Sequence, residues 1–333
     1  MTVLITGASG FIGTRLVQPG DRVLARAGSS MAGAVGGDLL DALSLAKACA
    51  DMDTVFHCAG YAHAFASSDS ERHWRVNFEG TRDLVNAAGA AGVKRFVFLS
   101  SVKAMAEPGD ECVDEDWPGE PDSSYGCAKR AAEDAVLAAG VKYGMHVVNL
   151  RLAMVYGRGG RGNLERMSRG IRAGWFPPLP ETGNKRSLVH VADVVAAMRL
   201  VADAPAANGR TYIVADARAY SGRELYDALR GVPPRLTMGR RQPASTANAQ
   251  PDSLDAEGGT FNWSVPAPLL RAGGWLGDVV GELLNRPLPV NSAVIDRLLG
   301  SACYSPARIE RELGWRAYVG LAAGVREMLG DEE

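Results

Sequence analysis

The sequence lacks an excess of charge of one sign and has no long apolar run. Its 36 basic residues nearly balance its 38 acidic ones, for a formal net charge of -2, so no electrostatic footprint for nucleic acid or a membrane surface is present. No stretch reaches the ~18 uninterrupted apolar residues of a membrane helix, and residues 2–6 form a strand-like run with no basic-then-apolar leader before it. These features predict a soluble, cytoplasmic protein.

Cysteine is sparse, and its spacing carries no metal-binding signature. The five cysteines are odd in number, and no two of them form a C-x-x-C pair: Cys49, Cys58, Cys112, Cys127 and Cys303. This pattern argues against a zinc site and against a disulfide framework. We therefore expect reduced thiols and no bound metal.

The chain does contain enough apolar material for a large core, arranged as alternating strands and helices. It has 333 residues, 47% of them hydrophobic, which suits one large domain or two lobes. Strand-like runs at 3–6, 23–25, 54–58, 95–100 and 146–150 alternate with helical stretches, clearest at 70–91 and 124–143. Alternation of this kind predicts an α/β fold with a Rossmann-type, doubly wound parallel sheet.

A change of composition divides the chain near Gly157. Residues 1–160 are expected to form the Rossmann domain, and segment 187–215 looks regular enough to rejoin its sheet. Residues 161–333, richer in Gly, Pro and Arg, are expected to form mainly a smaller, C-terminal substrate-binding lobe. Within it, residues 239–259 are polar and aperiodic, which predicts a flexible insertion.

The most informative local motif is a glycine-rich turn directly after the first strand, TGASGFIG at 6–13. The first glycine permits a tight turn, the second lets the backbone approach a pyrophosphate, and the third allows close packing of helix on strand. Exposed N–H groups at the following helix start then bind phosphate oxygens. We expect a dinucleotide to contact Gly7, Ser9, Gly10, Phe11, Ile12 and Gly13.

The end of the second strand bears on which dinucleotide is bound. An acidic residue there would bind the ribose 2′-hydroxyl of NAD, whereas an arginine accommodates the 2′-phosphate of NADP. The sequence offers Arg26 and no carboxylate close behind it, which favours NADP, although a solvated strand-end arginine is the alternative. Asp38 and Leu39, after the third strand, are expected to frame the adenine.

A tyrosine and a lysine at the head of the 124–143 helix form a candidate catalytic pair. Tyr125 and Lys129 are spaced i, i+4, so both lie on one helix face. A free tyrosine has a pKa of ~10, and a neighbouring ammonium would favour the phenolate needed for proton transfer near neutrality. Ser101, at the end of the fifth strand, is expected to bind the same substrate oxygen.

These motifs together resemble the extended short-chain dehydrogenase/reductase family, and within it the UDP-glucose 4-epimerase-like nucleotide-sugar epimerases, dehydratases and reductases. The similar segments are the glycine turn, FHCAG at 56–60, VNFEGT at 76–81, the serine strand 96–101, the Tyr125/Lys129 pair and VYG at 155–157. The resemblance implies that Ala59, Asn77, Val155, Tyr125 and Lys129 contact NAD(P). The family's proline two residues before Val155 is replaced here by Ala153.

Further segments are similar to the sugar-nucleotide subgroup, at 162–163, 186–193 and 311–315. The resemblance implies that Asn163 and Arg186 contact the nucleotide and its diphosphate, with Arg297 a weaker candidate and Ser101 and Lys103 near the sugar. The alternatives are a helix cap for Asn163 and exposed charges for the arginines. The helices at 70–91 and 124–143 resemble the pair that forms a homodimer interface in this family.

Three reactions compete under this resemblance. Sugar 4,6-dehydratases carry an Asp-Glu pair directly after the serine strand, but Val102 and Lys103 stand there, so dehydration is disfavoured. A UDP-sugar 4-epimerase, acting by hydride transfer at C4, and an NADPH-dependent UDP-4-ketosugar reductase would both use the same tyrosine. Both occur in the branch that serves bacterial polysaccharide biosynthesis. We favour the epimerase; a reductase of small ketones or aldehydes and a non-catalytic dinucleotide sensor are further alternatives.

Overall fold

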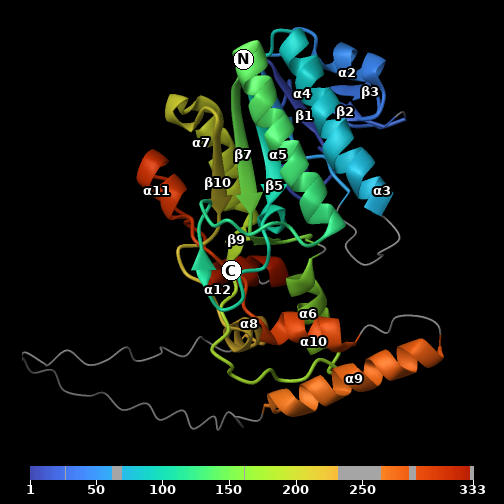
Figure 1. The fold of residues 1–333 in the computed structure, drawn as a ribbon, viewed down its shortest axis with the longest axis vertical. Coiled ribbons are helices and arrows are strands. Elements are labelled where there is room, and N and C mark those ends of the chain that lie inside the picture. Colours follow the sequence, from blue (N-terminus) through green and yellow to red (C-terminus); the bar gives the residue numbers. More distant parts are fainter. Residues whose placement is uncertain (27, 62–69, 161, 232–263, 285–289, 331–333) are drawn as a thin grey trace, which may run out of the picture. The chain divides into compact units, whose positions relative to one another are not determined.

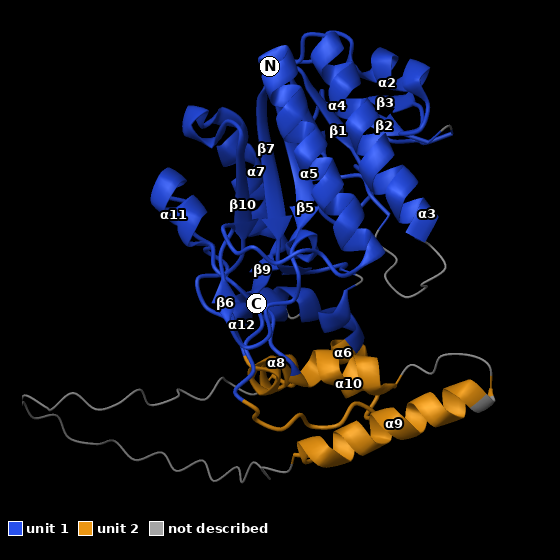
Figure 2. Ribbon diagram, viewed as in Figure 1, with its two compact units in different colours: residues 1–166, 183–220, 300–333 blue, residues 167–182, 221–299 orange. Residues whose placement is uncertain are grey.

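The computed structural model describes residues 1–26, 28–61, 70–160, 162–231, 264–284 and 290–330. The chain divides into two compact units (Figure 2). Unit 1 comprises residues 1–166, 183–220 and 300–333, and unit 2 comprises 167–182 and 221–299. The final segment, 300–333, thus belongs to unit 1, whereas the composition change had assigned it to the second lobe. The insertion expected at 239–259 lies outside the described residues.

Unit 1 is built on a seven-stranded sheet in the order β3-β2-β1-β4-β5-β7-β10 (Figure 1). Its neighbouring strands are all parallel. The strands are β1 (Val3–Thr6), β2 (Arg22–Ala25), β3 (Ala34–Gly36), β4 (Thr54–His57), β5 (Arg95–Ser101), β7 (His146–Leu152) and β10 (Arg210–Val214). This is the Rossmann-type α/β fold that the alternation of strands and helices predicted.

Helices cover both faces of this sheet. One face packs on α2 (Ala42–Cys49), α4 (Gly80–Ala90) and α5 (Ser124–Tyr143), and the other on α1 (Gly13–Leu16), α7 (Val191–Asp203) and α11 (Ala307–Leu313). Alternation within β5 sorts its side chains: Phe96 and Phe98 join the core under α5, whereas Val97 and Leu99 join the opposite core. Each sheet face is therefore buried, which accounts for the nearly continuous apolar runs of the strands.

The helix expected at 70–91 forms in three contiguous pieces. They are α3 (Ser70–His73), a π-helical stretch (Trp74–Glu79) and α4. Helix α5 follows the predicted bounds, because Ser123 caps its start by accepting a hydrogen bond from the Gly126 N–H. Its small residues Ala128, Ala132 and Ala139 are buried against the sheet and α4.

Unit 1 also contains two short parallel pairs. Strand β8 (Met154–Tyr156) pairs with β9 (Leu188–His190), and β6 (Cys112–Val113) pairs with β11 (Cys303–Tyr304). The second pair corrects the expectation of unpaired thiols, because Cys112 and Cys303 stand opposite each other and form a disulfide. They lie 191 residues apart, so only strand pairing brings them together. Cys49, Cys58 and Cys127 are free.

Unit 2 is helical in its described part. It contains the end of α6 (Asn163–Arg172), α8 (Gly222–Leu229), α9 (Ala267–Leu283) and α10 (Ser292–Leu299). Three further short elements belong to unit 1: the 3-10 turns η3 (Val102–Ala104) and η4 (Pro205–Ala207), and helix α12 (Leu321–Leu329). Within the described ranges no helix is long and apolar enough to cross a membrane. The same residues contain no cluster of His, Cys, Asp or Glu able to hold a metal ion.

Candidate active site

The glycine-rich turn lies at the carboxyl end of β1 and brings main chain against main chain. Gly7 has a φ of +71°, and a Cβ atom there would fall 2.5 Å from the Ala59 nitrogen. A Cβ at Gly13 would fall 2.2 Å from the Gly7 carbonyl oxygen, and the Gly10 N–H donates to that same oxygen at 2.9 Å. Only glycine fits at positions 7 and 13, so the chain forms a backbone cradle of the kind that a pyrophosphate requires.

A cavity of about 1070 Å³ opens at this turn. Seven of the residues predicted to bind the cofactor line it: Gly7, Ser9, Gly10, Arg26, Asp38, Leu39 and Ala59. The predicted residues Phe11, Ile12, Gly13, Asn77, Val155, Tyr125 and Lys129 are not among its lining residues. The lining residues fit the adenosine and phosphate end of a dinucleotide, and that assignment stays a prediction.

Three charged side chains of this cavity were missed by the sequence analysis. Glu71, Arg72 and Arg75 project into its lining from α3 and the π-helical stretch. The Arg72 guanidinium also lies 4.2 Å from the centre of the Tyr61 ring. Glu71 and Arg72 lie four and three residues before Arg75, so they share one exposed helix face, but nothing in the sequence showed that this face borders the glycine turn.

The predicted catalytic residues Ser101 and Tyr125 come together where β5 ends and α5 begins. Burial, the larger effect, raises the pKa of Tyr125, and the Ser101 side chain opposes that shift. The approach depends on Gly126, because a Cβ at this position would fall 2.1 Å from the Lys103 carbonyl oxygen. The Ser101 hydroxyl in turn accepts a hydrogen bond from the Lys103 N–H at 3.2 Å.

Lys129 is buried one turn further along α5. Its ammonium donates to the Leu99 carbonyl oxygen at 2.8 Å and lies 4.5 Å from the centre of the Phe98 ring. Burial lowers the Lys129 pKa to about 8, against opposing effects of Glu133 and Cys58. The expectation that this ammonium would set the pKa of Tyr125 is not met, because burial and Ser101 are the causes of that shift.

His73 lies beside Tyr125, and the Asn77 amide nitrogen lies 3.3 Å from the His73 ring nitrogen Nδ1. The Asn77 side chain accepts from the Tyr61 N–H at 2.7 Å and donates to the Tyr61 carbonyl at 2.8 Å. The His73 ring stands edge-on to the Tyr125 ring, with centroids 5.6 Å apart. Asn77 therefore fixes the backbone that follows β4, and its predicted contact with NAD(P) stays a prediction.

The turn at Val155 shows why Ala153 can replace the family's proline. The Ala153 N–H donates to the Val214 carbonyl at 3.1 Å, a bond that proline cannot make. Val155 lies in β8, partly buried against the core that includes α7. The alanine thus ties this turn to the edge strand β10, and the predicted role of Val155 at the cofactor remains a prediction.

The predicted substrate residues are distributed over both units. Lys103, in unit 1, forms an ion pair with Glu107. Asn163 is exposed at the first residue of α6, and Arg186 is partly buried, with its guanidinium donating to the Gly300 carbonyl at 3.1 Å. Arg297 is exposed on α10 in unit 2. Their contacts with substrate stay predictions.

Comparison with known proteins assigns the family. The model of the NAD dependent epimerase/dehydratase family matches residues 3–215. A UDP-glucose 4-epimerase of Vibrio cholerae is 28% identical over 348 residues, which cover 98% of this chain and 94% of that protein. A 3-beta-hydroxysteroid dehydrogenase of Mycolicibacterium neoaurum is 26% identical, over 94% of this chain and 86% of its own length.

The fold also resembles that of solved structures. The structure described as "MoeE5 in complex with UDP-glucose and NAD" superposes with a TM-score of 0.70 at 24% identity, covering 99% of this chain and 98% of that one. The chain therefore belongs to the NAD dependent epimerase/dehydratase family of extended short-chain dehydrogenases/reductases and is an NAD(P)-dependent enzyme.

Proposed function

We propose that the protein is a UDP-sugar 4-epimerase in which Tyr125 exchanges a proton with the C4 hydroxyl. The observation that carries this proposal is the placement of Tyr125 and Lys129 one turn apart on α5, with the buried Lys129 ammonium bound to the Leu99 carbonyl, two residues before Ser101. These residues belong to the same unit as the glycine cradle. The full-length similarity to the Vibrio cholerae UDP-glucose 4-epimerase supports the choice of substrate.

Each side chain has a distinct task in this reaction. The Tyr125 oxygen takes the proton from the C4 hydroxyl and later returns it. Ser101 binds the same oxygen of the sugar and holds Tyr125 in place. Lys129 contributes a buried ammonium one helical turn from Tyr125, where the family resemblance implies a contact with NAD(P). The bound NAD(P) supplies the hydride acceptor and donor. No carboxylate follows Ser101, because Val102 and Lys103 occupy the next turn, so elimination of water across C5 and C6 has no base there.

A second candidate is an NADPH-dependent UDP-4-ketosugar reductase. The favouring observation is the arginine content of the cavity, where Arg26, Arg72 and Arg75 all line the adenosine end. Guanidinium groups there match a 2′-phosphate. The steroid dehydrogenase relative shows that the family also includes enzymes that act on substrates other than sugar nucleotides, so a reductase of small ketones is the third alternative.

Product analysis distinguishes these reactions. The purified enzyme would be incubated with a panel of UDP-sugars and UDP-4-ketosugars, with and without added NADPH. Conversion of one UDP-sugar into its C4 epimer without net consumption of cofactor is expected. Stoichiometric NADPH oxidation with a 4-ketosugar would instead establish the reductase, and no reaction with either class would refute both.

Calorimetric titration of UDP tests the substrate class separately. We expect Arg186→Ala to weaken UDP binding by at least ~30-fold, because the diphosphate loses a forked donor. The matched control is Arg311→Ala, an exposed arginine on α11, which should bind UDP as the wild type does. A wild-type protein without affinity for UDP would overturn the assignment of a UDP-sugar substrate.

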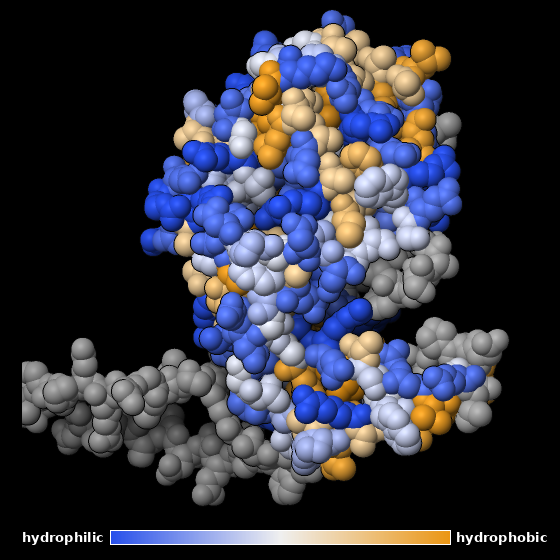
Figure 3. Space-filling model, viewed as in Figure 1, coloured by the Kyte–Doolittle hydropathy of each residue, from blue (hydrophilic) through white to orange (hydrophobic). Residues whose placement is uncertain are grey.

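We also propose that the enzyme is a homodimer joined through α4 and α5 with the helical segment before α4. On the visible face of unit 1, apolar residues occur in small groups among polar ones over these helices (Figure 3). Trp74 is 43% exposed and Val141 88% exposed, which suits burial against a second copy. Sedimentation velocity at micromolar concentration should show a dimer that Val141→Glu weakens, and a monomeric wild type would refute the proposal.

A further inference from the structure

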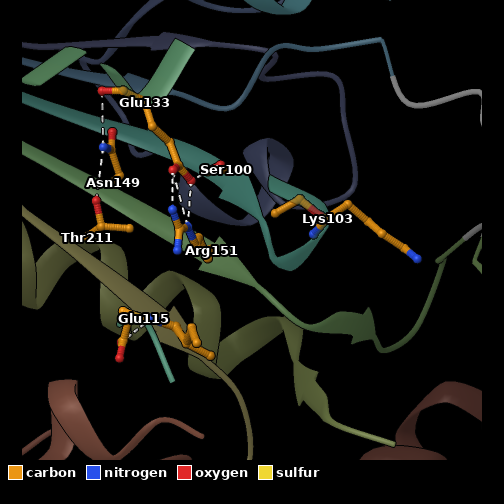
Figure 4. Close-up of polar contacts among 9 residues, drawn as sticks. Ser100, Lys103, Glu115, Glu133, Asn149, Arg151 and Thr211 are labelled. Atoms are coloured by element: carbon orange, nitrogen blue, oxygen red, sulfur yellow. Dashed lines mark hydrogen bonds and ion pairs between the residues drawn. The ribbon is translucent and has the colours of Figure 1, made fainter. Parts of the chain in front are cut away.

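A buried carboxylate lies one turn beyond Lys129 on the same face of α5. Glu133 is 2% exposed and accepts a hydrogen bond from the Ser100 hydroxyl at 2.5 Å. The Arg151 guanidinium binds it in a bidentate manner, with contacts at 3.0 and 2.7 Å. Figure 4 shows the Glu133 side chain reaching from α5 toward Ser100 and Arg151 on the sheet. Ser100 and Arg151 are direct partners in the β5–β7 register.

The Glu133–Ser100 hydrogen bond lies at the end of β5, between Leu99 and Ser101. Ser100 separates Leu99, whose carbonyl accepts from Lys129, from Ser101, whose side chain lowers the pKa of Tyr125. The Glu133 carbonyl also accepts from the Asn149 side chain at 3.3 Å, and that amide continues to Thr211 at 3.2 Å. Glu133 thus links α5 directly to β5 and β7, beside the reacting groups. Asn149 extends this network to β10.

The charge of Glu133 also acts on Lys129. The ionisable groups that interact with the ammonium are Glu133 on α5, Cys58 after β4 and His57 on β4, and Arg151 on β7 is the partner of Glu133. Burial lowers the pKa of Lys129, and Glu133 is the largest of the effects that raise it. Burial holds His57 neutral by lowering its pKa to about 3, and raises the pKa of the Cys58 thiol to about 12. Of the two groups that raise the pKa of Lys129, Glu133 therefore has the larger effect.

A purely stabilising role explains this arrangement poorly. Burying a carboxylate and a guanidinium removes both from water, and replacing such a pair with apolar residues is often neutral or stabilising. A buried ion pair is therefore weak evidence for a contribution to the stability of the fold. Its position beside Lys129 and Ser101 points to another role.

We propose that Glu133 is a positioning residue of the active site, which fixes the end of β5 that carries Leu99 and Ser101 and so sets the position of the Lys129 ammonium bound to Leu99. The inference rests on the proposed function only for its activity readout. It predicts that removing the Glu133 charge affects Lys129 even when the fold is intact. A role in stability alone predicts that Lys129 is unaffected once the fold is restored.

The test uses variants that separate charge from stability. Glu133→Gln leaves the Arg151 guanidinium buried without its acid, so this variant is expected to lose stability. The double variant Glu133→Gln/Arg151→Met removes both charges and keeps the volume, and should recover much of the loss. Glu133→Asp retains the charge. Asp134→Asn, on the exposed face of the same helix, is the matched control.

Lysine-selective ¹³Cε labelling provides a readout that needs no substrate. The chain has only six lysines, Lys47, Lys94, Lys103, Lys129, Lys142 and Lys185, and loss of one signal in Lys129→Met assigns the buried one. In Glu133→Gln the Lys129 titration midpoint should fall by at least about one pH unit, a tenfold change in proton affinity, and in the double variant, which also removes the Arg151 cation, it should fall by less. In Asp134→Asn it should stay, and in Glu133→Asp it should fall by less than in Glu133→Gln.

Activity provides the second readout. The alkaline limb of kcat should move to lower pH in the folded double variant, with kcat at pH 8 reduced at least ~10-fold and KM changed less than ~3-fold. A folded double variant with a wild-type Lys129 midpoint and a wild-type pH profile would overturn the inference. If the wild type proved inactive on every UDP-sugar, the proposed function would fail, while the Lys129 titration would still decide the role of Glu133.

Discussion

The ammonium of Lys129 donates a hydrogen bond to the carbonyl oxygen of Leu99, 2.8 Å away, across the contact between α5 and β5. Leu99 is two residues before Ser101 on the strand, and Lys129 is one turn after Tyr125 on the helix. This single bond therefore helps to set the register in which the Tyr125 and Ser101 side chains meet. The catalytic set is a consequence of how one helix docks on one strand.

Replacing Tyr125 with phenylalanine should reduce the rate of the enzyme by at least ~100-fold, because the ring remains while the proton-transferring hydroxyl is lost. Epimerase turnover, or reductase turnover if that is the reaction, would be measured with saturating cofactor. NAD(P) affinity should be nearly unchanged, and Tyr318→Phe, at a side chain that is 69% exposed, is the control. Near-normal turnover of Tyr125→Phe would remove Tyr125 from its role as acid and base.

Gly126→Ala should damage the active site through packing. The added Cβ would lie 2.1 Å from the Lys103 carbonyl oxygen, so α5 must move away from Ser101. We expect a loss of about 1–3 kcal/mol in stability and a fall in kcat. Gly273→Ala on α9, where a Cβ meets nothing within 4 Å, should instead stabilise its helix by about 0.5–1 kcal/mol. Thermal unfolding of both variants measures the contrast, and equal effects would contradict it.

Arg26→Asp should change the preference between the two dinucleotides. Arg26 lines the adenosine end of the cavity, where an aspartate would repel a 2′-phosphate and accept from a ribose hydroxyl. A charge-assisted contact contributes ~1.5–3 kcal/mol, or about one to two decades in affinity. Titration of NAD and NADP into the wild type and the variant decides the point. An unchanged ratio would leave Arg26 as a solvated side chain at the end of β2.

Asp216→Asn should flatten the dependence of stability on pH. Asp216 is 5% exposed, and burial raises its pKa to about 7, although the Tyr220 hydroxyl donates to it at 3.0 Å. Because the folded pKa exceeds the unfolded value of ~3.9, the folded state binds the proton more tightly. The associated stability is complete at about pH 4 and is lost as the pH rises to about 7.

The asparagine has no proton to lose and can still accept from Tyr220. Relative to the wild type, the variant should therefore gain about 2–4 kcal/mol in unfolding free energy between pH 4 and pH 8. Urea unfolding at both pH values measures this difference, with the exposed Asp134→Asn as the reference for an ordinary carboxylate. A constant difference between wild type and variant at the two pH values would refute the assignment to Asp216.

Much of the Rossmann sheet and the catalytic motif could be predicted because the signals are local. Alternating apolar residues and helical periodicity located β1, β5 and α5. Gly7 is required by its positive φ and Gly13 by its approach to the Gly7 carbonyl oxygen, both within an eight-residue stretch. The Tyr125/Lys129 pair follows from a spacing of one helical turn.

The remaining features depend on pairing between distant segments. The disulfide requires β6 and β11 to align Cys112 with Cys303, and no local pattern specifies that register. The arginines at 72 and 75 become cavity residues only because α3 packs beside the glycine turn. Glu133 offered a partial signal, since it continues the Tyr125/Lys129 face by one more turn, but its partners Ser100 and Arg151 come from two other elements.

The sequence by itself therefore determined the strands and helices, the glycine cradle and the types of chemical group at the site, because each is fixed by sterics or periodicity over a few residues. Tertiary structure alone decided the protonation behaviour. Lys129 has a pKa of about 8 because of the sheet that buries it and the carboxylate beside it, and the pKa of Tyr125 is set by its burial and by Ser101. Burial and the distance between charges are properties of the packed chain, and they control the free energy of each charged form.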